Sequence, residues 1–570
     1  MATSDSYKWT ALSNTTLGIF MASLDASIVI ISLPAIFRGI DLNPLTPANI
    51  GFLLWTLMGY MMCTAVLVVT FGRLGDIYGR VRMYNAGFFV FTLASVALSL
   101  TPGTGESAAL YLIVMRIAQG IGGAFLMANG GAILTDAFPP KQRGLAMGIN
   151  MVAAIAGSFI GLMVGGILAD INWRLIFWIN VPIGIFGTAW AYWKLRDTGV
   201  RKKERIDWWG NVTFALGLVL ILVGITYGIQ PYGGHTMGWT SPTVLGALVS
   251  GVILLAIFCA IEMNIVEPMF NLRLFKIRAF TAGNIASLLG SIGRGGLQFM
   301  LVIWLQGIWL PLHGYSFQST PLWAGIYMLP LTAGFLIAGP ISGWLSDRFG
   351  AKYFATGGMV LGAFAFLGLM LLPVDFPYPL FALVLFLSGI GSGLFAAPNS
   401  TAIMNSVPAH DRGQASGMRA TFMNSGQVLS IGLFFSLMII GLSSSLPSTI
   451  FSGLTAQGVP AQIAQQVASA PPVSSLFAAF LGYNPMQHLI PASVLSSLPP
   501  QNAALLTGNT FFPNLISAPF KQGLSITFIL SIIAYLIAAV ASWLRGERYV
   551  YGEKTSEEED EALTIEAIFE

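Results

Sequence analysis

Charged residues are scarce in this chain of 570 residues: Asp, Glu, Lys and Arg together make up 9%, against about 25% in a typical soluble domain. Hydrophobic residues make up 55%, and the mean hydropathy is +0.75. So few charges cannot cover a water-exposed surface, and the composition therefore predicts a polytopic membrane protein. The two cysteines, Cys63 and Cys259, fall inside apolar runs and say nothing firm about the redox compartment.

Sequence motifs that support covalent chemistry are also missing. The chain has no Gly-Lys dipeptide and therefore no phosphate-binding loop of the Walker type. It also lacks His-Glu-x-x-His, a nucleophile elbow and Cys-x-x-Cys. An ATP-driven pump or a standard hydrolase is left without support, so we expect no enzyme, no metal and no cofactor. Solute movement driven by a gradient remains.

Long apolar runs are plentiful, and a spanning helix needs about 20 such residues. The sequence predicts an all-α protein with fourteen transmembrane helices, near residues 11–37, 50–71, 83–101, 107–134, 144–168, 174–194, 208–229, 242–264, 279–308, 320–342, 354–372, 378–404, 414–441 and 522–544.

The distribution of positive charge predicts the orientation. Of the 27 Lys and Arg residues, three fall in outer segments, two lie within predicted spans, and all others fall on the opposite side. This skew predicts that both termini are cytoplasmic, in a multi-pass protein of the plasma membrane. The basic cluster after the sixth span, at 201–205, is then expected to be a cytoplasmic anchor in contact with membrane lipids rather than a nucleic-acid site.

An internal repeat divides the chain. Gly72, Asp76 and Gly79 recur as Gly343, Asp347 and Gly350, each 271 residues later. Two such halves in parallel repeat are a transporter architecture. The predicted domains are a six-helix bundle at 1–194, a two-helix insertion with basic linkers at 195–278, a second six-helix bundle at 279–545, and an acidic cytoplasmic tail at 546–570.

The second bundle includes a predicted external loop at 442–520. It contains no Asp, Glu, Lys or Arg, so it is expected either to cap the outer mouth or to lie on the membrane interface.

The segment at 72–82 is interpreted as a charged loop between two spans. Glycine at each end allows the backbone to reverse direction. Asp76 can cap a helix, and Arg80 can bind a carboxylate or a lipid phosphate.

Ionisable groups inside spans are costly and therefore point to function. Asp25 is the one carboxylate near the centre of a predicted span. Removal from water favours the protonated form of a carboxyl group, so Asp25 is a candidate proton carrier. Arg116, in the fourth span, could pair with it. The alternative is a static salt bridge that holds two helices together.

Further polar residues within the spans are candidates for lining a substrate cavity, although each could instead bond neighbouring helices. Arg294 could bind an anionic group or serve as a structural donor. The candidates are Gln119, Asn129, Arg294, Gln298, Asn399 and Asn424. In the fifth span, Gly157, Gly161, Gly165 and Gly166 form a smooth face, which could be fixed packing or a sliding surface.

Four segments together resemble the major facilitator superfamily, and within it the 14-span drug:proton antiporters of the EmrB/QacA type. Residues 24–34 resemble the first-helix signature centred on an aspartate, and 72–82 the loop between spans two and three. Residues 116–124 match the fourth-helix motif, and 172–184 resemble the sequence that joins spans five and six. The span-five motif departs from the family, because the chain has Leu162 where a proline is expected and so lacks a kink.

The resemblance implies roles for several residues. The cytoplasmic side would be gated by Asp76 and Arg80, with Gly72, Gly79, Asp347 and Gly350. Asp76 and Arg80 would hold the two halves of the protein together through a partner at 413–419. Arg116 would act in proton transfer with Asp25. The implied function is proton-coupled export of small, largely apolar compounds by a monomer that alternates access. The alternatives are a facilitator or importer of a metabolite or lipid-like solute, and a non-transporting membrane sensor.

Overall fold

The computed structural model describes residues 5–43, 46–139, 142–197, 207–265, 268, 270–408, 411–482 and 484–546. Fourteen of its helices are long and apolar enough to cross a membrane, and no strand occurs in the described residues. The predicted fourteen-helix, all-α architecture is confirmed. The basic cluster at 201–205 and most of the acidic tail, from residue 547 on, lie outside the described residues.

The N-terminal bundle contains six spans, the last of which is divided between two short helices. The helices are α1 (Asp5–Gly39), α2 (Pro47–Tyr78), α3 (Arg80–Ser99), α4 (Gly105–Ala137), α5 (Arg143–Ile171), α6 (Leu175–Trp178) and α7 (Asn180–Lys194).

The C-terminal bundle repeats this plan. Its first span is interrupted by a π-helical segment, η3, whose seven residues are all buried. The helices are α10 (Arg278–Gly295), α11 (Leu297–Val302), η3 (Ile303–Trp309), α12 (Leu310–Leu312), α13 (Thr320–Tyr327), α14 (Leu329–Phe349), α15 (Ala351–Leu371), α16 (Tyr378–Asn405), α17 (Arg412–Ala456) and α23 (Phe511–Trp543).

Two helices are inserted between the bundles: α8 (Trp208–Gly228) and α9 (Pro242–Asn264), followed by the short η2 (Leu272–Lys276). Helix α8 packs against α2 of the first bundle and α17 of the second. Thr70 donates a hydrogen bond to Asn211, and a side chain at Gly432 would collide with Ile225. Helix α8 therefore lies where the two bundles meet, and α9 packs against α8.

The sequence suggested that the 72–82 segment is a loop, and the structure corrects this. Helix α2 continues to Tyr78, and α3 begins at Arg80, so the chain turns at Gly79 alone, with φ of 109°. The repeat behaves in the same way, since α14 continues to Phe349 and the turn falls at Gly350, with φ of 81°. Gly72 lies inside α2, where a Cβ would only reach normal contact with Ala128, at 3.9 Å. The second glycine of each motif is therefore the one that reverses the chain.

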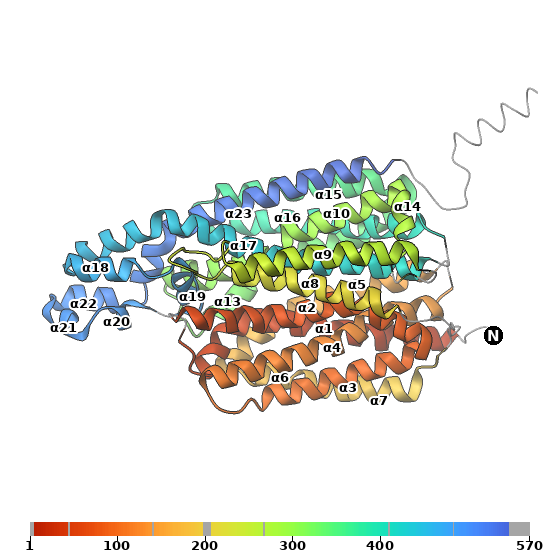
Figure 1. Cartoon of the computed structure of the whole chain (residues 1–570), viewed down its shortest axis with the longest axis horizontal. Coiled ribbons are helices and arrows are strands. Elements are labelled where there is room, and N and C mark those ends of the chain that lie inside the picture. The colour runs from red at the N-terminus through yellow and green to blue at the C-terminus, as the bar shows by residue number, and fades with distance from the viewer. Residues whose placement is uncertain are drawn as a thin grey trace, which may run out of the picture.

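The predicted external loop is largely helical, which is a second correction. Helix α17 has 45 residues, or roughly 67 Å at 1.5 Å per residue, about twice the thickness of the hydrocarbon layer. It is followed by α18 (Ala461–Ala468), α19 (Pro472–Phe480), α20 (Met486–Leu489), α21 (Ala492–Ser497) and α22 (Pro500–Thr507). Figure 1 shows α18, α20, α21 and α22 projecting beyond the bundle, at the end opposite to the start of α1.

Candidate functional site

Asp25 and Arg116 form a buried ion pair inside the N-terminal bundle. Asp25 lies near the middle of α1, and Arg116 lies on α4. The Arg116 Nη1 atom is 2.5 Å from Asp25 Oδ2, and the side chains are 2% and 0% exposed. The sequence-based prediction that Arg116 could pair with Asp25 agrees with this geometry. At such burial each charge depends on its partner, because an isolated ion would be very costly.

Two amide side chains complete the shell of the carboxylate. Asp25 Oδ1 accepts hydrogen bonds from Gln119 Nε2 at 2.9 Å and from Asn180 Nδ2 at 2.7 Å. Gln119 Nε2 also donates to Ser95 Oγ at 2.9 Å, and Gln119 Oε1 accepts from Arg116. Gln119 therefore belongs to the ion-pair network, and it links α4 to α1 and α3.

Arg116 has neutral partners besides the carboxylate. Its Nε lies 3.4 Å from the carbonyl oxygen of Thr56, and its guanidinium carbon lies 4.5 Å from the centre of the Tyr60 ring. A cation over an aromatic face is stabilised electrostatically. These contacts, with Gln119 Oε1, would still hold the guanidinium if Asp25 lost its charge.

Asn180 is the one hydrogen-bond partner of Asp25 that was not among the candidate residues selected from the sequence. It lies in the motif at 172–184, which was interpreted only as a family signature. A single asparagine in an apolar run does not reveal which helix it faces, so the available signal was its presence within a recognised motif.

The glycines of α5 explain how α1 is held in place. A Cβ on Gly157 would lie 2.5 Å from the carbonyl oxygen of Phe20, and one on Gly161 would lie 2.5 Å from that of Leu24. Helix α1 therefore packs directly on the backbone of α5. Gly166 faces the other bundle instead, where its Cβ would lie 2.5 Å from Leu322 Cα on α13. The glycine face thus contributes both to packing within the bundle and to contact between bundles.

The motif residues Asp76 and Arg80 form a second charged cluster, where α2 ends and α3 begins. Arg80 lies 2.7 Å from Asp76 and 2.7 Å from Asp136 of α4. Neither Asp76 nor Arg80 bonds to α17 in the described part of the chain, where the resemblance had implied the partner at 413–419. Helix α17 does approach α2 there, because a Cβ on Gly417 would lie 3.6 Å from Val69. The side chain of Asp347 lies outside the described residues.

The predicted cavity residues do not gather at one site. Asn129 and Asn399 are buried. Asn129 Nδ2 donates to the Phe71 and Phe125 carbonyls, and Asn399 Nδ2 donates to the Gly283 carbonyl and Ser287 Oγ. Both therefore serve helix packing. Arg294 is exposed, Gln298 and Asn424 are half-buried, and none of these three forms a hydrogen bond among the described residues.

Arg545, just beyond α23, is a buried cation that the sequence analysis did not single out. It donates to Asn399 Oδ1, and burial lowers the pKa of its guanidinium to about 10.

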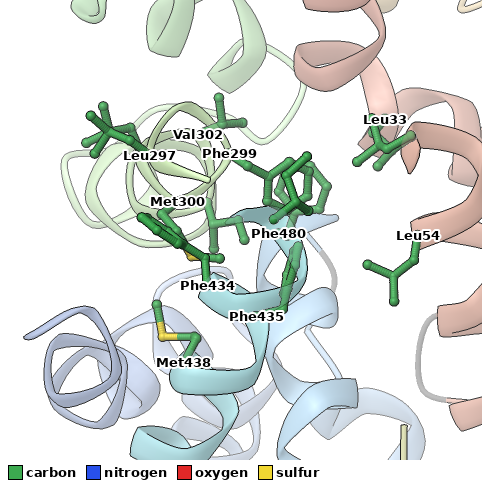
Figure 2. Packing of buried hydrophobic residues seen from close by; sticks show 14 of the residues in the cluster. Leu33, Leu54, Leu297, Phe299, Met300, Val302, Phe434, Phe435, Met438 and Phe480 are labelled. Atoms are coloured by element: carbon green, nitrogen blue, oxygen red, sulfur yellow. The ribbon is translucent and has the colours of Figure 1, made fainter. Parts of the chain in front are cut away.

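Helix α19 fills the space between the two bundles, at the end from which α18, α20, α21 and α22 project. All nine of its residues are buried. The Phe480 ring lies 5.1 Å from that of Phe299, and the Phe477 ring 5.3 Å from that of Phe435. Figure 2 shows Phe299 and Phe480 side by side, facing Leu33 and Leu54 of the N-terminal bundle. Of the segment at 442–520, α19 is therefore buried between the bundles.

A cavity of about 250 Å³ lies beside α19, where α1 and α5 end. Arg38 contacts the end of α19 through the Leu481 carbonyl oxygen, at 3.5 Å. The cavity is lined by Ala35, Arg38, Ala169, Asp170, Gln318 and Pro321.

Comparison with known proteins identifies a matching family and several relatives. The profile of the Major Facilitator Superfamily matches residues 15–431. The chain is 30% identical to the riboflavin transporter RibZ of Clostridioides difficile, over 75% of this chain and 88% of that protein. It is 28% identical to the tetracenomycin C resistance and export protein of Streptomyces glaucescens, over 77% of each chain. It is also 29% identical to the multidrug resistance protein Stp of Mycobacterium tuberculosis, over 76% of each.

Solved structures share the fold at lower identity. An inward-facing bacterial homologue of the human lysosomal transporter Spinster matches with a TM-score of 0.55 and 16% identity, over 95% of this chain and 98% of that one. A peptide transporter of the POT family in complex with sulfate matches with a TM-score of 0.54 and 16% identity, over 87% and 96%.

Proposed function

Because the chain belongs to the major facilitator superfamily, a family of membrane transporters, we propose that it is a proton-coupled exporter of small hydrophobic or amphipathic compounds. The observation that carries this proposal is the ion pair between Asp25 and Arg116 in the middle of the N-terminal bundle. A carboxylate held away from water is the group through which a transporter can bind and release protons.

The coupling step follows from the partners of each charge. A proton taken up by Asp25 neutralises the carboxylate and weakens its attraction to Arg116. The guanidinium then keeps Gln119, the Thr56 carbonyl and the Tyr60 ring as partners. These neutral partners lower the cost of the buried cation while Asp25 is protonated.

Alternating access would use the contacts between bundles at both ends. On the outer side the release path would open by separation of α5 from α13 and by withdrawal of α19. On the inner side it would open by separation of α2 from α17, with Asp76, Arg80 and Asp136 holding the adjoining ends of α2, α3 and α4 together. Gly79 and Gly350 would fix the corresponding turns in the two halves.

The orientation and assembly are also part of this proposal. The multi-pass protein would lie in the plasma membrane with both termini in the cytoplasm, as its positive charges favour. It would work as a monomer built of two six-helix bundles, at 1–194 and 279–545, joined by the insertion at 195–278. Its partners would be protons, membrane lipids and the transported compound.

The cargo class is suggested by the relatives. Several carry names that refer to drug or antibiotic resistance and export, and the aromatic cluster of Phe299, Phe435 and Phe480 would suit an apolar compound on its way out. The second candidate is transport of an aromatic metabolite, because the relative at 30% identity is named a riboflavin transporter.

Two measurements test the proposal. Growth of a sensitive host on a panel of toxic compounds, with and without expression, should identify compounds to which the protein confers resistance. In everted vesicles with an imposed pH gradient, such a compound should accumulate inside the vesicles, and the pH difference across the membrane should decrease. Riboflavin uptake into intact cells, with no resistance to any compound, would favour the alternative and defeat the exporter assignment.

A further inference from the structure

The motif Ile179-Asn-Val-Pro-Ile-Gly184 lies at the start of α7, and each of its polar or small residues has a contact that explains it. Pro182 lies in the first turn of α7, where its missing N–H leaves no hydrogen bond of that helix unmade. A Cβ on Gly184 would collide with Thr92 of α3, so α7 packs closely on α3. Asn180 is fully buried, and its amide is directed at Asp25. The motif therefore brings one carboxamide to the carboxylate of α1.

The hydrogen bonds of this amide are only half used. Asn180 Nδ2 donates to Asp25 Oδ1 at 2.7 Å, whereas Asn180 Oδ1 is buried and has no hydrogen-bond partner among the residues that the structure describes. An unmet buried acceptor is costly and calls for an explanation. Gln119, the other amide on Asp25, already has partners at both ends, because its Oε1 accepts from Arg116 and its Nε2 donates to Asp25 and Ser95.

A carboxyl group needs different partners in its two states. The carboxylate only accepts, whereas the protonated acid also has an O–H that must find an acceptor. Among the side chains that bond to Asp25, Asn180 is the one whose acceptor oxygen has no partner in the described part of the chain. A half-turn of its amide would exchange Nδ2 for Oδ1 without moving a helix.

We propose that Asn180 is a positioning residue of the proton site: it donates Nδ2–H to the carboxylate of Asp25 and, after proton uptake, turns its amide to accept the acid O–H at Oδ1. The proton moves from water to Asp25 and back, and no bond of Asn180 itself is made or broken. The inference rests on the proposed role of Asp25 as the proton carrier.

The other ionisable groups around Asp25 do not perform this task. Arg116 of α4 can only donate, and from α2 the nearest titratable side chains are Tyr60 and Cys63, which do not bond to Asp25. Helix α5 faces the site with Gly161, and its nearest described acid, Asp170, lies at the outer end of that helix. Helix α7 contributes Asn180 and no charged group at that level.

An infrared pH titration of the purified protein in lipid vesicles tests the proposal without any cargo. The band of a protonated carboxyl group that disappears in Asp25→Asn is assigned to Asp25. In Asn180→Leu this band should shift to higher wavenumber, because the acid has lost its acceptor. Its pH midpoint should rise by about one pH unit, because a hydrogen bond to a charged group is the stronger of the two that are lost.

A matched control comes from the same pair of helices. Asn14 of α1 is also fully buried, and its Nδ2 donates to the Gly187 carbonyl of α7 at 3.3 Å. Asn14→Leu removes a buried amide that joins α1 to α7 but does not touch Asp25, so the band should stay at the wild-type position. Asn180→Ser, which can still donate and accept, should fall between Asn180→Leu and the wild type, and it carries the test if the leucine variant does not fold.

The outcomes separate this inference from the proposed function. If Asp25→Asn removes no titrating band, Asp25 does not exchange protons and the proposed function fails. If an Asp25-dependent band exists but keeps its wavenumber and midpoint in the Asn180 variants, the role of Asn180 is overturned and the function stands.

Discussion

The guanidinium of Arg80 joins two carboxylates of the same bundle, with Asp136 Oδ1 2.7 Å from its Nη1 and Asp76 Oδ1 2.7 Å from its Nη2. Arg80 begins α3, Asp76 lies in the last turn of α2, and Asp136 lies near the end of α4. The three helix ends are therefore tied together around one cation, whose side chain is 24% exposed. At that exposure each pair is worth only about 1 kcal/mol.

This geometry predicts that the two carboxylates partly replace one another. Asp76→Asn and Asp136→Asn should each lower the unfolding temperature and the transport rate modestly. The double variant should lose more than the sum of the two, because Arg80 is then left without a charged partner. Thermal unfolding followed by tryptophan fluorescence, together with vesicle transport, measures both effects. Glu106→Gln, an exposed acid at the opposite end of α4, is the control; strictly additive losses would contradict the shared cluster.

A second prediction concerns the packing of α1 on α5. Gly161→Ala places a methyl group 2.5 Å from the Leu24 carbonyl oxygen, so the helices must separate beside Asp25. Overpacking of this kind costs about 1–3 kcal/mol, and proton-coupled transport should fall with it. Gly148→Ala is the matched control on the same helix, since nothing lies within 4 Å of its Cβ. Unfolding temperatures of the two variants give the comparison, and equal stability would show that the close contact does not exist.

The sequence predicted the fourteen spans because hydropathy over twenty residues is a strong signal. It predicted that Arg116 could pair with Asp25, because few other charged residues lie inside the spans. It did not reveal that α2 continues through Gly72 to Tyr78, because charged residues at a helix end resemble a loop in composition. The burial of α19 and the direction of Asn180 depend on tertiary contacts, which single-chain patterns do not encode.

A third prediction concerns α19, which fills the space between the two bundles. In a background of Cys63→Ala and Cys259→Ala, Ala479→Cys should be almost unreactive toward a membrane-impermeant maleimide, because Ala479 is 2% exposed. Ser496→Cys, at an exposed position of α21, should be labelled promptly. A pH gradient that drives turnover should raise labelling at position 479 alone. Equal and rapid labelling of both positions in the resting protein would show that α19 does not close the outer mouth.

A fourth prediction concerns the aromatic partner of Arg116. Tyr60→Phe should retain near-normal stability and transport, because the ring is kept and the Tyr60 hydroxyl forms no hydrogen bond with any described residue. Tyr60→Leu removes the face beneath the guanidinium and should cost about 1–2 kcal/mol. Thermal unfolding measures the difference, and two variants of equal stability would remove the cation–aromatic contact from the account.

The central claim is that protons reach the transport cycle through Asp25. The most direct measurement is proton movement in vesicles that contain Asp25→Asn, recorded with an internal pH dye while a compound identified by the resistance panel is added. We expect the variant to exchange the compound across the membrane at equilibrium, but to move no protons with it and to build no concentration gradient. Undiminished uphill transport with normal proton release in Asp25→Asn would contradict the account.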